Sequence, residues 1–264
     1  MASKRELLDA YNALSGKLVR GTSNQMATAF RNLGSWRDED FRAFYKILDS
    51  TMTGAKLQAA RLQIAFYSEM AKAAGEKFTA PILMANDFRV ETLRNGAEAV
   101  TVYRRPFVDV YTALKDGKSV TDAIEAGALR ISSLVSTDIQ LARRNAGFAA
   151  RGKNNRIVGY ARTLTGSENC ALCYIASTQR YHVKDLLPIH PGCDCGEMPI
   201  YGNQDPGQVI DEVRLDATHE AVSTRFGGPD YSGAGYDKIA IREHGELGPM
   251  LTVADQNFTG PSDL

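Results

Sequence analysis

The sequence lacks long apolar runs and uses few of the residue types that mark unusual folds. No apolar stretch approaches the roughly 18–20 residues that cross a bilayer, so we expect no membrane span. The opening segment, MASKRELLDAYNALSGK, is charged and amphipathic and has no apolar core of the kind found in secretory signals. The 264 residues include four cysteines, four histidines and one tryptophan. We therefore expect a globular protein of a reducing compartment, where disulfides are rare.

A net charge is also absent, because 31 Lys and Arg balance 31 Asp and Glu. The balance hides an asymmetry along the chain. Residues 1–160 carry 24 basic against 16 acidic side chains, whereas residues 201–264 carry 4 against 11. Oppositely charged ends favour steering toward a partner of matching charge pattern, or contact of the basic part with nucleic acid. The alternative is a plain solvated surface.

The first 150 residues predict a helical bundle. Ser3 and Glu6 have the spacing of a capping box. A second helix is expected from near Asp38, with a bend or break at Gly54. Ser119 is a typical N-cap for a further long helix. The expected core stripes of these helices are Leu7, Tyr11, Leu14 and Leu18, then Phe41, Phe44, Leu48 and Met52, and then Ile124, Ala128, Ile131, Val135, Ile139 and Ala142.

The character of the sequence changes near residue 151. The segments RIVGYARTLTG and PGCDCGEMPIYG each contain a short run that predicts a strand. A helix is expected from about Asp205 to Phe226, followed by an extended acidic tail. We therefore predict an α+β protein with a helical domain at residues 1–150, a Cys/His module at 151–204, and a helix plus tail at 205–264.

All four cysteines lie in one block, CALCYIASTQRYHVKDLLPIHPGCDC, which spans residues 170–195. Cys170 and Cys173 have the Cys-x2-Cys spacing of half a zinc knuckle. Cys193 and Cys195, with His190 just upstream, supply the second half. Four thiolates, or three thiolates and an imidazole, form a closed tetrahedral set without an open position. The block thus predicts a structural zinc site made by four of these five residues.

Three other interpretations of the block remain open. The same geometry is compatible with packed thiols that bind no metal, or with a disulfide formed late in oxidising surroundings. A catalytic cysteine, with His182 or His190 as its base, is the third. A nucleophilic cysteine needs a nearby base and an exposed setting that lowers its pKa. Four clustered cysteines are more than such a nucleophile needs, and this favours the zinc site.

A basic segment precedes the cysteine block. No acidic residue occurs between Asp138 and Glu168. Such a segment predicts either salt-sensitive contact with DNA phosphates through residues 139–167 or docking on an acidic protein surface. The candidate nucleic-acid or partner-binding residues are Arg143, Arg144, Arg151, Lys153 and Arg156.

The segment GYARTLTGSENCALC, followed by YHV and PIHPGCDCGEMPIY, resembles the C-terminal signature of phage Mu protein F-like minor head proteins. That signature has a Cys-x2-Cys pair, then His-x2-Cys-x-Cys and a short apolar strand. The likeness covers residues 157–201 and is greatest to versions in tailed phages of actinobacteria, whose tails also resemble IREHGELGPMLTV. The helical N-terminal region fits the family's general layout.

The resemblance implies a minor capsid protein of the virion head. It would be associated with the portal and other capsid proteins, assemble in the host cytoplasm, and act in head assembly and DNA passage. Relatives are often labelled capsid maturation proteases, and that activity is the alternative. However, the sequence contains no Gly-x-Ser-x-Gly and no His-Glu-x-x-His motif. The resemblance therefore assigns candidate zinc ligands and no catalytic residue.

Overall fold

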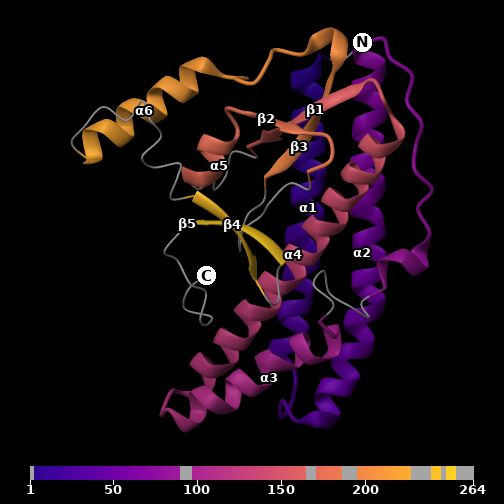
Figure 1. Cartoon of the computed structure of the whole chain (residues 1–264). Coiled ribbons are helices and arrows are strands. Elements are labelled where there is room, and N and C mark those ends of the chain that lie inside the picture. Colours follow the sequence, from indigo (N-terminus) through magenta and orange to yellow (C-terminus); the bar gives the residue numbers. More distant parts are fainter. Residues whose placement is uncertain are drawn as a thin grey trace.

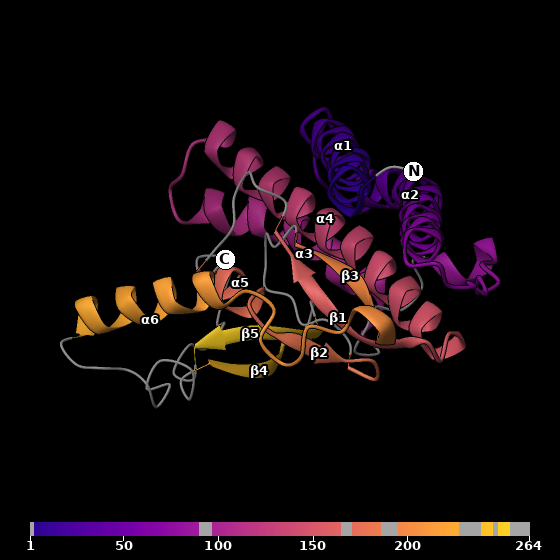
Figure 2. The ribbon, with the colours of Figure 1, turned by 90° about the horizontal axis from the view of Figure 1, so that it is seen from above.

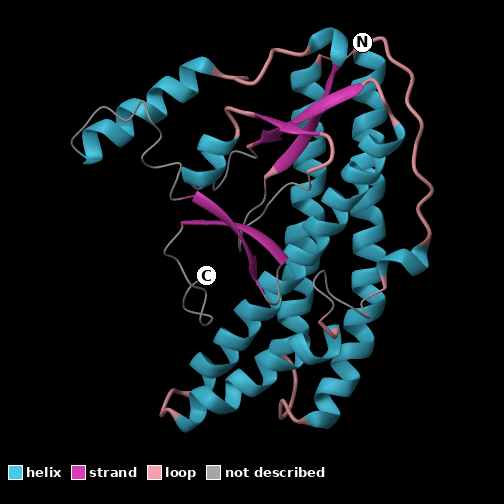
Figure 3. Ribbon diagram, viewed as in Figure 1, coloured by secondary structure: helices cyan, strands magenta, loops and turns pink. Residues whose placement is uncertain are grey.

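The computed structural model describes residues 3–89, 97–164, 171–185, 195–226, 239–244 and 248–253. The protein is mainly helical with short strands (Figures 1 and 3). The longer helices are α1 (Lys4–Arg31), α2 (Asp38–Ala73), α3 (Ala99–Lys115), α4 (Val120–Lys153) and α6 (Glu212–Phe226). The short helices are η1 (Ala85–Phe88), α5 (Ala171–Ala176) and η2 (Gly202–Gln204). The strands are β1 (Ile157–Thr163), β2 (Arg180–His182), β3 (Gly196–Tyr201), β4 (Ile239–His244) and β5 (Gly248–Val253).

The helix ends largely follow the predicted signals. The capping box of Ser3 and Glu6 is confirmed, and the hydroxyl of Ser119 accepts from the backbone N–H of Asp122. Gly75, just after α2, has a φ of +71°, a left-handed conformation that suits glycine at a helix end. The predicted break at Gly54 is not found, because α2 runs through this position without interruption.

The lower half of the molecule in Figure 1 is a helical bundle. The helices α1, α2 and α4 run side by side, and α3 folds back on the first half of α4 (Figures 1 and 2). Their aromatic side chains meet in one core, where the ring of Phe107 lies 4.9 Å from that of Phe30 and 5.6 Å from that of Phe44. Most of the predicted stripes are buried here, but Leu14 is exposed.

A three-stranded antiparallel sheet of order β2-β1-β3 covers the second half of α4. It shares a second core with the helices, to which Tyr11, Tyr67, Ala146, Ile157 and Tyr201 contribute. The predicted strands at residues 157–163 and 196–201 are thereby confirmed. The expected border at residue 150 falls inside α4, and the sheet buries its apolar residues against the helices.

The C-terminal part differs from the prediction. The last long helix, α6, begins at Glu212 and not near Asp205, because residues 208–210 instead pair with the chain just before β2. It extends away from the bundle (Figures 1 and 2). Within the expected extended tail, β4 and β5 form an antiparallel hairpin. None of the described helices is long and apolar enough to cross a membrane.

Two helix glycines offer a test of this architecture. A Cβ at Gly127 of α4 would lie 2.7 Å from the ring of Phe30 and 3.1 Å from the carbonyl oxygen of Pro106. We expect Gly127→Ala to lower the free energy of unfolding by about 1–2 kcal/mol, since overpacking outweighs the gain in helix propensity.

The matched control is Gly54→Ala in α2, where nothing lies within 4 Å of the added atom. This variant is expected to raise the free energy of unfolding by about 0.5–1 kcal/mol through helix propensity alone. Urea unfolding followed by circular dichroism measures both. Equal effects of the two substitutions would contradict the close approach of α4 to Phe30.

Candidate functional site

The structure brings the two halves of the cysteine motif together. Cys173 lies in α5 and Cys195 directly precedes β3, yet both belong to one small buried cluster with Leu141 of α4. Each of the two cysteines is 1% exposed. Cys170, His190 and Cys193 lie outside the described residues. Two of the five predicted ligands are thus located, and they are neighbours, as a shared site requires.

No disulfide joins Cys173 to Cys195. Within the described part of the chain, no group of three or more His, Cys, Asp or Glu side chains is placed to hold a metal ion. The zinc site and the packed thiols both stay predictions.

Guanidinium groups surround the two cysteines. Nη1 of Arg162, on β1, donates to Sγ of Cys173 at 3.5 Å. Nη2 of Arg143 and Nη2 of Arg144, on α4, donate to the carbonyl oxygen of Cys195 at 2.6 and 3.3 Å. Positive charge beside a thiol favours its thiolate form, and thiolates are the ligands that Zn²⁺ prefers. The donor set therefore fits a zinc site.

The basic segment does not form the exposed patch predicted from the sequence. The exposed fractions of Arg143, Arg144 and Arg151 are 3%, 0% and 3%. A guanidinium group at this depth does not reach a phosphate on another molecule, so burial argues against contact of these three arginines with DNA or a partner. Lys153 and Arg156 are exposed, and Nη2 of Arg156 lies 2.9 Å from Oε1 of Glu76. For these two, the prediction stays a prediction.

Arg151 instead forms a buried ion pair with Glu197 of β3. Its Nη1 lies 2.6 Å from Oε1 of Glu197, with side-chain exposures of 0% and 1%. The hydroxyl of Tyr67, on α2, donates to the same Oε1 at 3.0 Å. The guanidinium also donates to the carbonyl oxygens of Val183 and Asp185, at 3.1 and 2.9 Å. One arginine thus connects α2, α4, β3 and the segment after β2.

The electrostatics of this cluster are dominated by burial. Burial raises the pKa of the Glu197 carboxyl above its ordinary value, against the opposing pull of the Arg151 guanidinium. Burial also raises the pKa of Tyr67 well above its usual range, and the neighbouring Glu197 carboxylate adds to this shift. The phenol therefore keeps its proton and acts as a hydrogen-bond donor to Glu197.

Gly147 of α4 permits the close approach of the carboxylate. A Cβ at this position would lie 1.6 Å from Oε1 of Glu197, so any side chain here displaces the ion pair. Sequence reasoning missed Glu197, Tyr67 and Gly147. The available signal was a single acidic residue in an apolar strand, GEMPIY, set against a long upstream segment without acidic residues.

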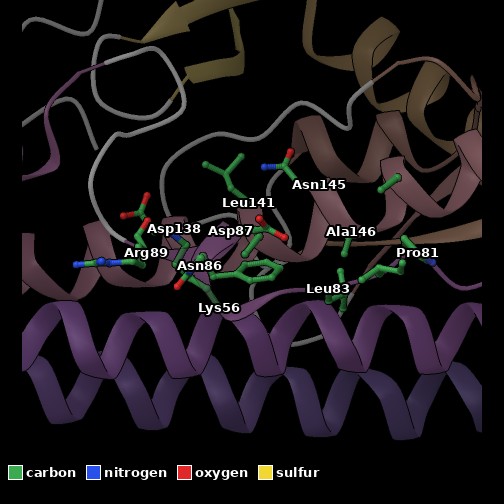
Figure 4. A pocket seen from close by; sticks show the side chains of 14 residues that line it. Lys56, Pro81, Leu83, Asn86, Asp87, Arg89, Asp138, Leu141, Asn145 and Ala146 are labelled. Carbon is green, nitrogen blue, oxygen red and sulfur yellow. Dashed lines mark hydrogen bonds between the residues drawn. The ribbon is translucent and has the colours of Figure 1, made fainter.

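A groove of about 470 Å³ lies between α2, α4 and the segment before and including η1. Figure 4 shows a polar end near Arg89 and Asp138 and an apolar end near Pro81 and Leu83. The carboxylate of Asp138 accepts a hydrogen bond from the hydroxyl of Tyr103 at 2.6 Å. The described residues that line the groove include Lys56, Asp87 and Asp138. The groove therefore offers a partly charged surface for binding.

Three of the four histidines lie in the described part of the chain, on β2, α6 and β4. His182 lies on β2 at the surface, and its Nδ1 accepts from the backbone N–H of Lys184 at 3.2 Å. His219 lies in α6. A thiol nucleophile has to be reached by its substrate, whereas the sulfur-bearing side chains of Cys173 and Cys195 are buried. Burial therefore argues against a nucleophilic role for these two cysteines.

Comparison of the chain with protein-family models, curated proteins and solved structures found no match. The family therefore rests on the motif resemblance of residues 157–201 and stays a prediction. Residues 157–201 contain the three strands of the sheet and both described cysteines.

The ion pair of Arg151 and Glu197 generates a prediction about stability. Arg151→Met is expected to lower the free energy of unfolding by about 3–5 kcal/mol, because it leaves a buried carboxylate without its cation. Adding Glu197→Leu to the same chain is expected to restore most of this loss, since the uncompensated charge is then removed.

The control is Arg104→Met, which removes an exposed pair with Asp38 and is expected to cost about 0–1 kcal/mol. A double-mutant cycle from urea unfolding gives the coupling between Arg151 and Glu197. Strictly additive effects of the two substitutions would show that the pair does not stabilise the fold as described.

Proposed function

We propose that the protein is a structural minor head protein of a tailed bacteriophage. In this role it is associated with the portal vertex or the head interior and takes part in head assembly and DNA passage. The proposal begins with the motif resemblance of residues 157–201. One observation carries it further: the cysteines described in this segment are interior, held by arginines against a long helical scaffold. Such an arrangement suits a structural element that stabilises the shape of a protein that docks on other head proteins.

The finer part of the proposal is a zinc-stapled module. Its candidate ligands are Cys170, Cys173, His190, Cys193 and Cys195, of which four bind a structural Zn²⁺. The clustering of Cys173 with Cys195 and the adjacent guanidinium groups support it. A bound zinc ion would stabilise the folded state of this segment. Without it, the small cluster around the two cysteines contains few buried residues.

Two other functions have less support. A maturation protease acting on scaffold or capsid proteins needs an accessible nucleophile, and the described thiols are 1% exposed. Contact with DNA through residues 139–167 loses three of its five candidate side chains to the interior, which leaves Lys153 and Arg156. The structural role is therefore proposed first.

Particle composition tests the function. The protein is expected in purified phage particles at low copy number, detected by immunoblot and mass spectrometry, and it is expected to co-purify with the portal protein when both are produced together. Absence from particles and failure to bind the portal would contradict the structural role. Normal assembly accompanied by uncleaved head proteins, in phage carrying Cys173→Ser, would support the protease instead.

Metal analysis tests the zinc site. The purified protein is expected to contain about one zinc ion per chain, and Cys170→Ala or Cys173→Ala is expected to lose it together with thermal stability. His182→Ala is the matched control, a histidine in the same block that is not a candidate ligand, and it should keep the metal. A wild-type protein that folds normally at neutral pH with no bound metal would refute the zinc site.

A further inference from the structure

Four arginine side chains are buried beside the sheet. Each is at most 3% exposed, and they are Arg143, Arg144, Arg151 and Arg162. Arginine stays protonated in proteins, so burial does not neutralise these groups. Arg151 pairs with the buried carboxylate of Glu197. The thiol of Cys173 and the carbonyl oxygen of Cys195 are among the groups that accept hydrogen bonds from the other three arginines.

Arg162 is placed to act on the sulfur of Cys173. It sits on the central strand β1, opposite Glu197 in the register of β3, which fixes its backbone. Its Nη1 reaches Sγ of Cys173 at 3.5 Å, a hydrogen-bond distance for a sulfur acceptor. Burial raises the pKa of Tyr181, and the nearby Arg162 guanidinium opposes that shift. The guanidinium therefore lies between Cys173 and Tyr181, two residues that come from different elements.

Cys195 is held in a different way. Arg143 donates from Nη2 to its carbonyl oxygen at 2.6 Å and from Nη1 to Oγ of Ser15 at 2.6 Å. A second donor to the same carbonyl comes from Arg144 at 3.3 Å. The backbone of Cys195 is thus tied to α4, and through Ser15 to α1. One cysteine is fixed at its sulfur and the other at its main chain.

We infer that Arg162 is a positioning residue for a thiolate–metal site: it orients the Cys173 sulfur and balances its negative charge, while Arg143 fixes Cys195 through the main chain. The inference rests on the zinc site of the proposed function and adds to it the outer contacts of the ligands. Such outer contacts orient metal ligands, and their loss typically lowers metal affinity roughly 10–100-fold. A planar guanidinium gives two directed donors, which a lysine ammonium does not reproduce.

The test compares metal binding by Arg162→Met, Arg162→Lys and the wild type as full-length proteins. Zn²⁺ affinity is measured by competition with a chromogenic chelator. The Co²⁺-loaded forms are compared by the intensity of their thiolate-to-cobalt absorption. We expect Arg162→Met to bind Zn²⁺ roughly 10–100-fold more weakly and to show an altered cobalt spectrum. Arg162→Lys is expected to recover part of the affinity and part of the cobalt absorption, because lysine restores the positive charge but not the planar guanidinium.

Two further variants keep the test decisive. Arg61→Met, which removes an exposed arginine of α2, is expected to leave Zn²⁺ affinity and the cobalt spectrum unchanged. If Arg162→Met does not fold, as judged by far-UV circular dichroism, Arg162→Lys and Arg143→Lys carry the comparison, each with an expected loss of affinity. Unchanged affinity and spectra in the folded Arg162 variants would overturn the inference and leave the zinc site intact. A wild-type protein that binds neither Zn²⁺ nor Co²⁺ would overturn both.

Discussion

The carboxylate of Glu197 is the point at which the helices and the sheet of this protein are joined. It accepts from Arg151 of α4 and from Tyr67 of α2, and a glycine at position 147 leaves the room that it occupies. Its removal from water is costly, so the pair is stable only while every partner is in place. The arrangement therefore fixes one orientation of β3 against α4. Cys195 lies two residues before Glu197 in the chain, and its position follows from the same constraint.

The arginines that α4 contributes to the basic segment are buried. The absence of acidic residues between Asp138 and Glu168 suggested a surface for phosphates. In the structure, α4 turns its arginines toward the sheet, and their partners come from elsewhere in the chain, including a carboxylate from β3 and main-chain oxygens near β2 and β3. Arg162, on β1, donates to the thiol of Cys173. A local excess of charge in a sequence does not reveal on which side of a helix the compensating group lies.

Local signals in the sequence predicted the helices well, because caps, turns and apolar spacing act over a few residues. Ser3 and Ser119 have the predicted roles, and the two short strands lie where expected. The spacing of the cysteines predicted that Cys173 and Cys195 would meet. What the sequence did not reveal depends on contacts between distant residues. Tyr67 and Glu197 are 130 positions apart, and the late start of α6 reflects pairing of residues 208–210 with the chain before β2.

The two cores meet along α4. The bundle core extends along α4 only as far as Ile139, whereas the core under the sheet begins at Ala142 and includes Ile157 and Tyr201. Arg143 and Arg144 stand at this boundary and hold the carbonyl oxygen of Cys195. A metal ion at the proposed zinc site would therefore act first on β3 and on the charged groups around it. The bundle has its own aromatic contacts, so its core does not depend on such an ion.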